Sequence, residues 1–271
     1  MNQNRSNDNR PQENRSPSSV RRSRHAHGIN YNAKPKMALT INLALEEDVT
    51  TCRDLEALLL DVVRQFQRLI PAGPALGYKP LEISHNPFGR PLCAVGRLPD
   101  RYRILLFAGT GPFRDDYSNR DLCRLAFQLA HEMGHLYADP RNNNDFIENI
   151  CWASSLFTLE DMAKRWPQHA PFPNWQSFAP NFKKYQERQS SRAKESLGDH
   201  RFNEISKLTD YFLRRPRAWR TIAFLGAGQS EIDLKNPLHN QFKAKTTFIP
   251  KLWLQALPEE LRPFGEDILK L

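Results

Sequence analysis

The spacing of the hydrophobic positions changes along the chain and predicts both helices and strands. Apolar residues recur every three or four positions over 54–70, as on one face of a helix. The same spacing returns after residue 118 and again over 145–157, on either side of a polar turn at 139–144. Four short apolar runs bounded by turn-forming or charged residues predict strands. They are 37–45, 81–84, 91–95 and 102–107.

Capping residues indicate where the two central helices begin. Ser118 followed by Asp121 resembles a capping box in which Asp replaces the usual Glu. Asn144 is a favourable N-cap, and Asp145 places a negative charge at the positive end of the second helix. The two helices therefore follow one another with only a short turn between them.

Beyond residue 160 the pattern is helical but interrupted by prolines. The stretch 166–181 predicts loops, and the almost wholly polar stretch 187–199 predicts a mobile segment. Further helices are predicted over 202–214, 216–225 and 258–270.

These elements together predict an α+β fold in three parts. Residues 1–35 form a tail, 36–158 a core with a small antiparallel or mixed sheet, and 159–271 a mainly helical C-terminal region.

Charge is unevenly distributed among these parts. The 271 residues include 39 Lys and Arg and 30 Asp and Glu, a net charge of +9. Residues 1–35 carry seven basic and two acidic side chains and almost no aliphatic ones, so we expect this tail to be disordered. Residues 183–220 carry eleven basic and five acidic side chains, whereas 36–158 is slightly acidic. The positive excess therefore lies outside the predicted core.

The composition also bears on location. No run approaches 18 apolar residues, so we expect no membrane span, and the polar first thirty residues lack the apolar region of a signal peptide. We expect a cytoplasmic protein, with export as an effector by a signal-peptide-independent route as the alternative. The four cysteines form no Cys-x-x-Cys pair and are expected to be buried thiols. They are Cys52, Cys93, Cys123 and Cys151.

One motif in the first central helix carries chemistry. It reads His131-Glu132-Met133-Gly134-His135. Two histidines four residues apart lie on one helix face, where their imidazoles can converge on one zinc ion. Glu132 can then reach a water on that ion and act as a general base. This pattern is expected about 0.01 times by chance in such a chain, so the sequence predicts a zinc site here.

A catalytic zinc requires a third protein ligand and an open position. Ala138 and Arg141 stand where the metzincin signature has Gly and His, which excludes that class. Glu148, in the first turn of the following helix, is the leading candidate for the third ligand. Asp145, one turn before, and Cys151, one turn after, are the alternatives.

These residues carry a resemblance to a known family. His131–His135, followed by Glu148 and its helix, resembles the gluzincin branch of zinc peptidases and looks most like the small ImmA/IrrE-type metallopeptidases. In that family, Ala-Asn, an aromatic–Ala pair and two apolar residues follow the third-ligand Glu. Trp152-Ala153 and Leu156-Phe157 match this pattern, whereas Asn149-Ile150 replaces Ala-Asn.

The resemblance covers about 80–158 and implies a zincin-like core with an active-site helix and a third-ligand helix. It implies His131, His135 and Glu148 as zinc ligands and Glu132 as the catalytic base. It also implies that the strand Tyr102–Phe107 is an antiparallel edge strand beside the cleft. The expected activity is zinc-dependent hydrolysis of peptide bonds in a protein or peptide substrate.

The residue that stabilises the oxyanion is left open by the sequence. Tyr137 and His200 are the candidates. Packing is the simpler role for Tyr137, and exposure near the start of a helix is an equally simple reading of His200.

Two other functions remain open from the sequence alone. The first is a nucleic-acid-associated protein, with or without protease activity, that binds through the basic tail and 183–220. Aromatic residues interleave with the positive charges of that segment, which suits stacking on single strands, although core packing is the simpler role. They are Tyr185, Phe202, Tyr211, Phe212 and Trp219. The second is a zinc-bound pseudoenzyme or interaction module.

Overall fold

The computed structural model of the chain divides into two units, Met1–Lys34 and Pro35–Leu271. All the residues that the structure describes belong to the second unit, so the predicted disordered tail lies outside them. The described residues are 39–41, 53–70, 73–74, 77–86, 89, 91–94, 100–108, 117–215, 218–228, 230–232, 238–240 and 243–270.

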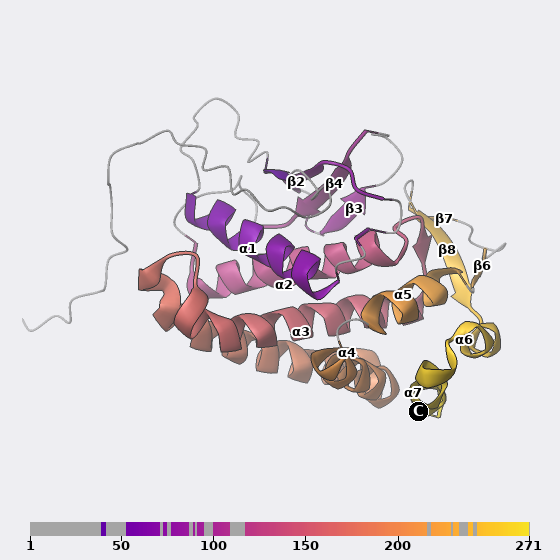
Figure 1. The fold of residues 1–271 in the computed structure, drawn as a ribbon. Coiled ribbons are helices and arrows are strands. Elements are labelled where there is room, and N and C mark those ends of the chain that lie inside the picture. The colour runs from indigo at the N-terminus through magenta and orange to yellow at the C-terminus, as the bar shows by residue number, and fades with distance from the viewer. Residues whose placement is uncertain are drawn as a thin grey trace, which may run out of the picture. The chain divides into compact units, whose positions relative to one another are not determined.

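The second unit combines a helical majority with two small sheets, which is the predicted α+β class (Figure 1). The helices are α1 (Arg53–Leu69), α2 (Asn119–Ala138), α3 (Asp145–His169), α4 (Ala179–Arg214), α5 (Trp219–Gly228), α6 (Pro250–Ala256) and α7 (Arg262–Leu269), with 3-10 turns at Pro173–Phe178 and Glu259–Leu261. The strands are β1 (Leu39–Ile41), β2 (Leu81–His85), β3 (Leu92–Ala94), β4 (Tyr102–Leu106), β5 (Asn142–Asn143), β6 (Ser230–Ile232), β7 (Leu238–Asn240) and β8 (Lys243–Phe248).

The first sheet is mixed, and its order is β1-β2-β4-β3. Strands β1, β2 and β4 are parallel, with Ile83 opposite Ile104, whereas β3 runs antiparallel to β4 with Cys93 opposite Ile104. The prediction that Tyr102–Phe107 is an edge strand is therefore wrong, because β4 has a partner on both sides. The strands at the two edges of this sheet, as described, are β1 and β3, and β3 is the one paired with β4.

A second sheet joins the turn after α2 to the C-terminal region. β5 pairs in parallel with β8, which also pairs with β6 and β7 in antiparallel fashion. The prediction of a mainly helical C-terminal region thus misses three strands. The local pattern over 139–144 predicts a turn and no strand, because β5 is only two residues long and its partner lies about a hundred residues later.

Helix α2 is the centre of the unit. From Leu125 to Ala138 nearly every side chain is buried, as expected for a helix covered on several faces. Figure 1 shows the first sheet above α1 and α2, with α3 and α4 below them. The end of β4 is tied to α2 by a hydrogen bond of 3.0 Å from the Phe107 N–H to Gln128 Oε1.

Helices α3 and α4 are both longer than predicted. The apolar spacing of α3 continues through Met162 and Trp166, both fully buried, so the boundary drawn at 158/159 falls inside one continuous helix. Pro173 and Pro180 lie in the first turns of a 3-10 turn and of α4, positions where proline is tolerated, rather than in loops.

The predicted mobile stretch 187–199 is helical and belongs to α4. Most of its polar residues are exposed, whereas Gln189 and Ala193 are buried. Only Gly198, with φ 80° and ψ 164°, interrupts the helix, and glycine adopts such angles without strain. None of the helices in the described segments is long and apolar enough to cross a membrane.

Candidate metal centre

The two histidines of the motif lie on α2, one turn apart. The helix begins at the predicted cap, because the Ser118 hydroxyl accepts a hydrogen bond from the Asp121 N–H. The ring centroids of His131 and His135 are 5.1 Å apart. The side chain of His131 is 14% exposed and that of His135 is 2% exposed, so the first histidine reaches the surface and the second is buried.

Helix α3 brings the third group to the histidines. Asn144 caps its start by accepting a hydrogen bond of 2.9 Å from the Ile147 N–H, as predicted. The helix packs against α2 where Gly134 meets Cys151, a contact that leaves no room for a side chain on α2. This close approach places Glu148, in the first turn of α3, opposite the histidine pair.

Glu148 contacts both histidines at once. Its Oε2 lies 3.2 Å from His131 Nε2, and its Oε1 lies 3.4 Å from His135 Nε2. Two ligands of one tetrahedral zinc, each about 2.0–2.1 Å from the ion, lie about 3.3 Å apart. Both distances between Glu148 and the histidines are close to this spacing.

The electrostatic setting of Glu148 also suits a cation. Burial raises its pKa, but the charges and hydrogen bonds of His135 and His131 outweigh this effect and hold the pKa well below its usual range. Glu148 is therefore a carboxylate, the form that binds a metal.

Glu132 lies beside the histidine pair and is buried. It is 3% exposed, and its Oε2 forms no hydrogen bond with any residue in the described segments. A buried carboxylate oxygen without a donor is costly and uncommon, so it points to a group, such as a water or a substrate, that completes the site.

Of the two alternative ligands, the structure sets Asp145 apart from the histidines but keeps Cys151 beside them. The side chain of Asp145 is 90% exposed and pairs with Arg201 at 3.8 Å. Cys151 is fully buried, and its Sγ lies within 4.8 Å of the ligand atoms of both histidines. Asp145 is thus turned to solvent, whereas Cys151 stays within reach of the site.

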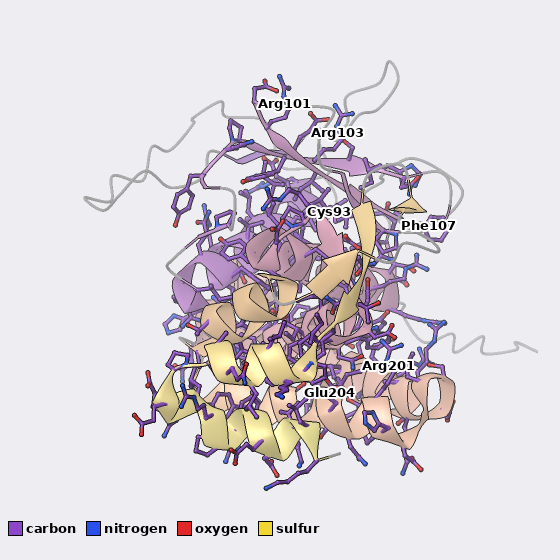
Figure 2. The ribbon with its side chains drawn as sticks, turned by 90° about the vertical axis from the view of Figure 1, so that its right-hand side faces the viewer. Cys93, Arg101, Arg103, Phe107, Arg201 and Glu204 are labelled. Atoms are coloured by element: carbon purple, nitrogen blue, oxygen red, sulfur yellow. The ribbon has the colours of Figure 1, made fainter. Side chains whose placement is uncertain are left out.

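A network that the sequence analysis missed supports the start of α3. Asn149 accepts two hydrogen bonds from Arg201, at 2.9 and 2.8 Å, and donates one of 2.9 Å to Glu204 Oε2. Both partners come from α4 and are labelled in Figure 2. They hold the residue next to Glu148 and so support the first turn of α3, where Glu148 lies.

Glu204 is the perturbed member of this network. Burial raises its pKa to about 7, although Asn149 and Arg201 act in the opposite direction. The only local signal for the network was the Asn that follows Glu148. Its partners lie more than fifty residues later along the chain.

The two oxyanion candidates do not reach the centre by any described contact. Tyr137 is fully buried, and its ring packs edge-on against Phe66, with centroids 5.4 Å apart, and against Trp219 at 6.4 Å. Packing is thus its role, the simpler of the two readings. His200 is exposed on α4.

The aromatic residues of 183–220 are mostly core residues. Tyr185, Phe212 and Trp219 are buried, and Tyr211 stacks on Phe264 with ring centroids 3.7 Å apart. These four rings are therefore engaged in packing, whereas Phe202 is half-buried and Lys194 lies over its ring, 5.9 Å from the centroid.

Comparison with protein-family models, curated proteins and solved structures finds no match to this chain. The interpretation of the site therefore rests on the motif and on the geometry that α2, α3 and α4 give it.

Proposed function

We propose that this protein is a zinc-dependent metallopeptidase with a zincin-like core, α2 being its active-site helix and α3 its third-ligand helix. The observation that supports this most is the meeting of His131, His135 and Glu148 at 3.2–3.4 Å with Glu132 buried beside them. His131, His135 and Glu148 would hold the ion, and the side chain of His131 is 14% exposed.

When bound, zinc supplies a Lewis acid that lowers the pKa of water toward 7 and polarises a carbonyl group. Glu132 accepts the proton of the attacking water as the water oxygen bonds to the carbonyl carbon. It then delivers that proton to the leaving nitrogen as the C–N bond breaks. Its burial and its unoccupied Oε2 suit a carboxylate that exchanges protons with the substrate rather than with the protein.

The substrate backbone is expected to pair with β3. This strand lies at the end of the sheet order, and its other side is paired to β4. An extended peptide can add to such an edge by main-chain hydrogen bonds. β3 also contacts α2, the helix that carries the histidines, which supports this choice of strand.

The test compares metal content and cleavage in matched variants. We expect about one zinc per chain in the wild type and in Glu132→Gln, and loss of zinc in His135→Ala. Cleavage is measured by mapping new protein N-termini in a cell extract. It should fall about 10²–10⁴-fold in Glu132→Gln. Glu56→Gln, at an exposed position on α1, is the control and should cleave like the wild type.

Each outcome bears on a separate part of the proposal. Undiminished cleavage by Glu132→Gln would show that Glu132 is not the general base. A wild-type protein that binds no zinc would show that the site is not a zinc site. Zinc at one per chain without any Glu132-dependent cleavage would instead support a zinc-bound interaction module.

A further inference from the structure

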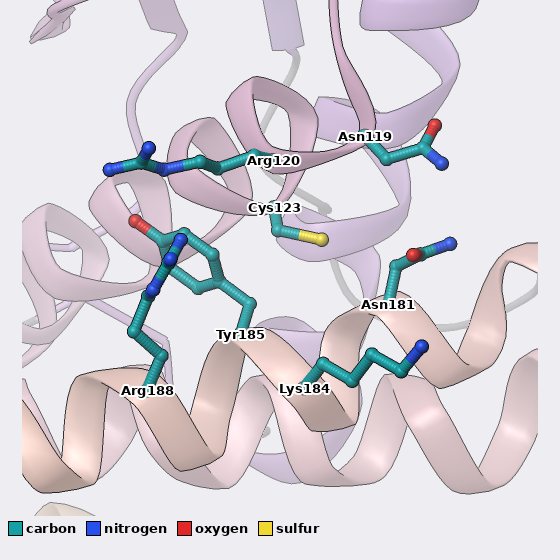
Figure 3. A pocket seen from close by; sticks show the side chains of 7 residues that line it. All are labelled: Asn119, Arg120, Cys123, Asn181, Lys184, Tyr185 and Arg188. Carbon is teal, nitrogen blue, oxygen red and sulfur yellow. The ribbon is translucent and has the colours of Figure 1, made fainter.

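A second site lies away from the metal centre, between the start of α2 and the first half of α4. It is a pocket of about 420 Å³, larger than one small anion needs and within the range of small-molecule sites. Figure 3 shows the side chains that line it, from both helices. Three are cations: Arg120 from α2, and Lys184 and Arg188 from α4.

These three positive charges are not neutralised by any residue in the described part of the chain. Arg120, Lys184 and Arg188 make no ion pair there, although their neighbours do. Arg124 pairs with Asp121 at 3.0 Å, and Lys183 pairs with Glu160 at 2.8 Å. In Figure 3 the guanidinium groups of Arg120 and Arg188 lie at the end of the pocket that holds the Tyr185 hydroxyl, whereas the Lys184 ammonium points to the opposite end. The like charges of the two arginines repel, so an anion between them is favourable.

The remaining walls add donors and no negative charge. Tyr185 is buried, and burial raises its pKa, so its hydroxyl stays protonated and can donate a hydrogen bond. Burial likewise raises the pKa of the Cys123 thiol to about 12, so this wall carries no thiolate. Asn119 is the first residue of α2, where the positive end of a 20-residue helix also favours an anion.

We propose that this pocket binds the phosphate group of a small molecule. Two arginines match the double charge of a phosphate better than the single charge of a carboxylate. The planar guanidinium groups of Arg120 and Arg188 can each bind two phosphate oxygens, and Lys184, at the other end of the pocket, is placed to meet another part of the ligand. The volume left beside the phosphate accommodates the rest of the ligand. This site is independent of the zinc chemistry proposed for α2 and α3.

Isothermal titration calorimetry on the full chain at low salt tests the proposal. The probes are inorganic phosphate, pyrophosphate and a nucleoside monophosphate, with hexaglutamate and a single-stranded oligonucleotide for comparison. We expect the small phosphates to bind. We also expect affinity to fall tenfold or more in Arg120→Ala and in Arg188→Ala, because each loses a charge-assisted hydrogen bond to phosphate.

Two controls separate the pocket from general charge and from the metal centre. Lys183→Ala removes a neighbouring charge of α4 that Glu160 already pairs, and should leave affinity unchanged. His135→Ala should also bind phosphate like the wild type. Arg120 and Arg188 are exposed, so their variants should fold, which circular dichroism checks.

Three results would overturn the proposal. The first is no binding of any small phosphate, and the second is binding that Arg120→Ala and Arg188→Ala leave unchanged. The third is preference for another partner: tighter binding of hexaglutamate would indicate an acidic peptide, and binding of the oligonucleotide alone would indicate nucleic acid.

Discussion

Gly134 lies on α2 between the two histidines, at the point where α2 touches α3. A Cβ at this position would lie 2.9 Å from Cys151 Sγ and 3.1 Å from Cys151 Cα. Favourable contacts between carbon atoms need about 3.5–4.0 Å. Because the Cα belongs to the backbone and cannot rotate away, Gly134→Ala must push α3 away from α2 by several tenths of an ångström.

The sign of the stability change depends on two opposing effects. Alanine is favoured over glycine within a helix by about 1 kcal/mol. Overpacking a dense core costs about 1–3 kcal/mol, and contact with an immovable backbone atom favours the upper half of that range. We therefore expect Gly134→Ala to lower the free energy of unfolding by about 1–2 kcal/mol. Because Glu148 moves with α3, zinc affinity should also fall.

Urea denaturation of wild type, Gly134→Ala, Cys151→Ala and the double variant measures this effect. Cys151→Ala removes the Sγ, so Gly134→Ala should cost less in that background, and the two changes should be non-additive. The reasoning would be refuted if Gly134→Ala stabilised the protein by about 1 kcal/mol and left zinc affinity unchanged. That result would mean that the higher helix propensity of alanine outweighs the overpacking, and that α3 shifts at little energetic cost.

Three further variants test the network, the core and the metal site. Folded Glu204 keeps its proton up to about pH 7, whereas the unfolded chain releases it near about pH 4.3, so the wild type should lose up to about 3 kcal/mol of stability as pH rises between these values. Glu204→Gln, which can still accept from Asn149, should not show this loss in urea melts. Asp61→Ala should cost about 2–3 kcal/mol in thermal unfolding, because Arg165 loses its buried acceptor. Zinc at a hundred times its Kd should stabilise the wild type by about 2.7 kcal/mol and leave His135→Ala unchanged.

The controls for these variants come from the same chain. Asp100→Ala breaks an exposed pair with Arg101 and should leave the unfolding temperature unchanged, in contrast to Asp61→Ala. An equal pH dependence in wild type and Glu204→Gln would show that another group titrates. Stabilisation of His135→Ala by zinc would place the ion elsewhere.

Features that depend on neighbours within one helical turn could be predicted from the sequence. The start of α2 at Ser118 and the start of α3 at Asn144 follow from side chains that cap N–H groups three residues later. The placement of His131 and His135 on one face follows from the helical period alone. The prediction that Glu148 lies near the histidines also required α3 to fold back on α2, which the short turn between the two helices favoured.

The predictions of loops over 166–181 and of a mobile segment over 187–199 were wrong, because the effect of a proline or a polar residue depends on its position in a helix. Pro173 and Pro180 begin helical segments, where a missing N–H costs nothing. The polar stretch 187–199 is helical because one of its faces packs on the rest of the unit, and propensity is a weak guide when tertiary packing decides.

The sequence by itself determined the metal motif, its helix and the capped start of the next helix, since these rest on contacts a few residues apart. Only the tertiary structure decided which strand lies at the edge of the sheet, because β4 finds its second partner, β2, about twenty residues earlier. It also decided the support of Glu148 through Asn149 and Glu204, and the meeting of Arg120 with Arg188 around one pocket. These pairs are more than fifty residues apart along the chain, and they meet because buried faces of separate helices must pack together, a condition that no local pattern expresses.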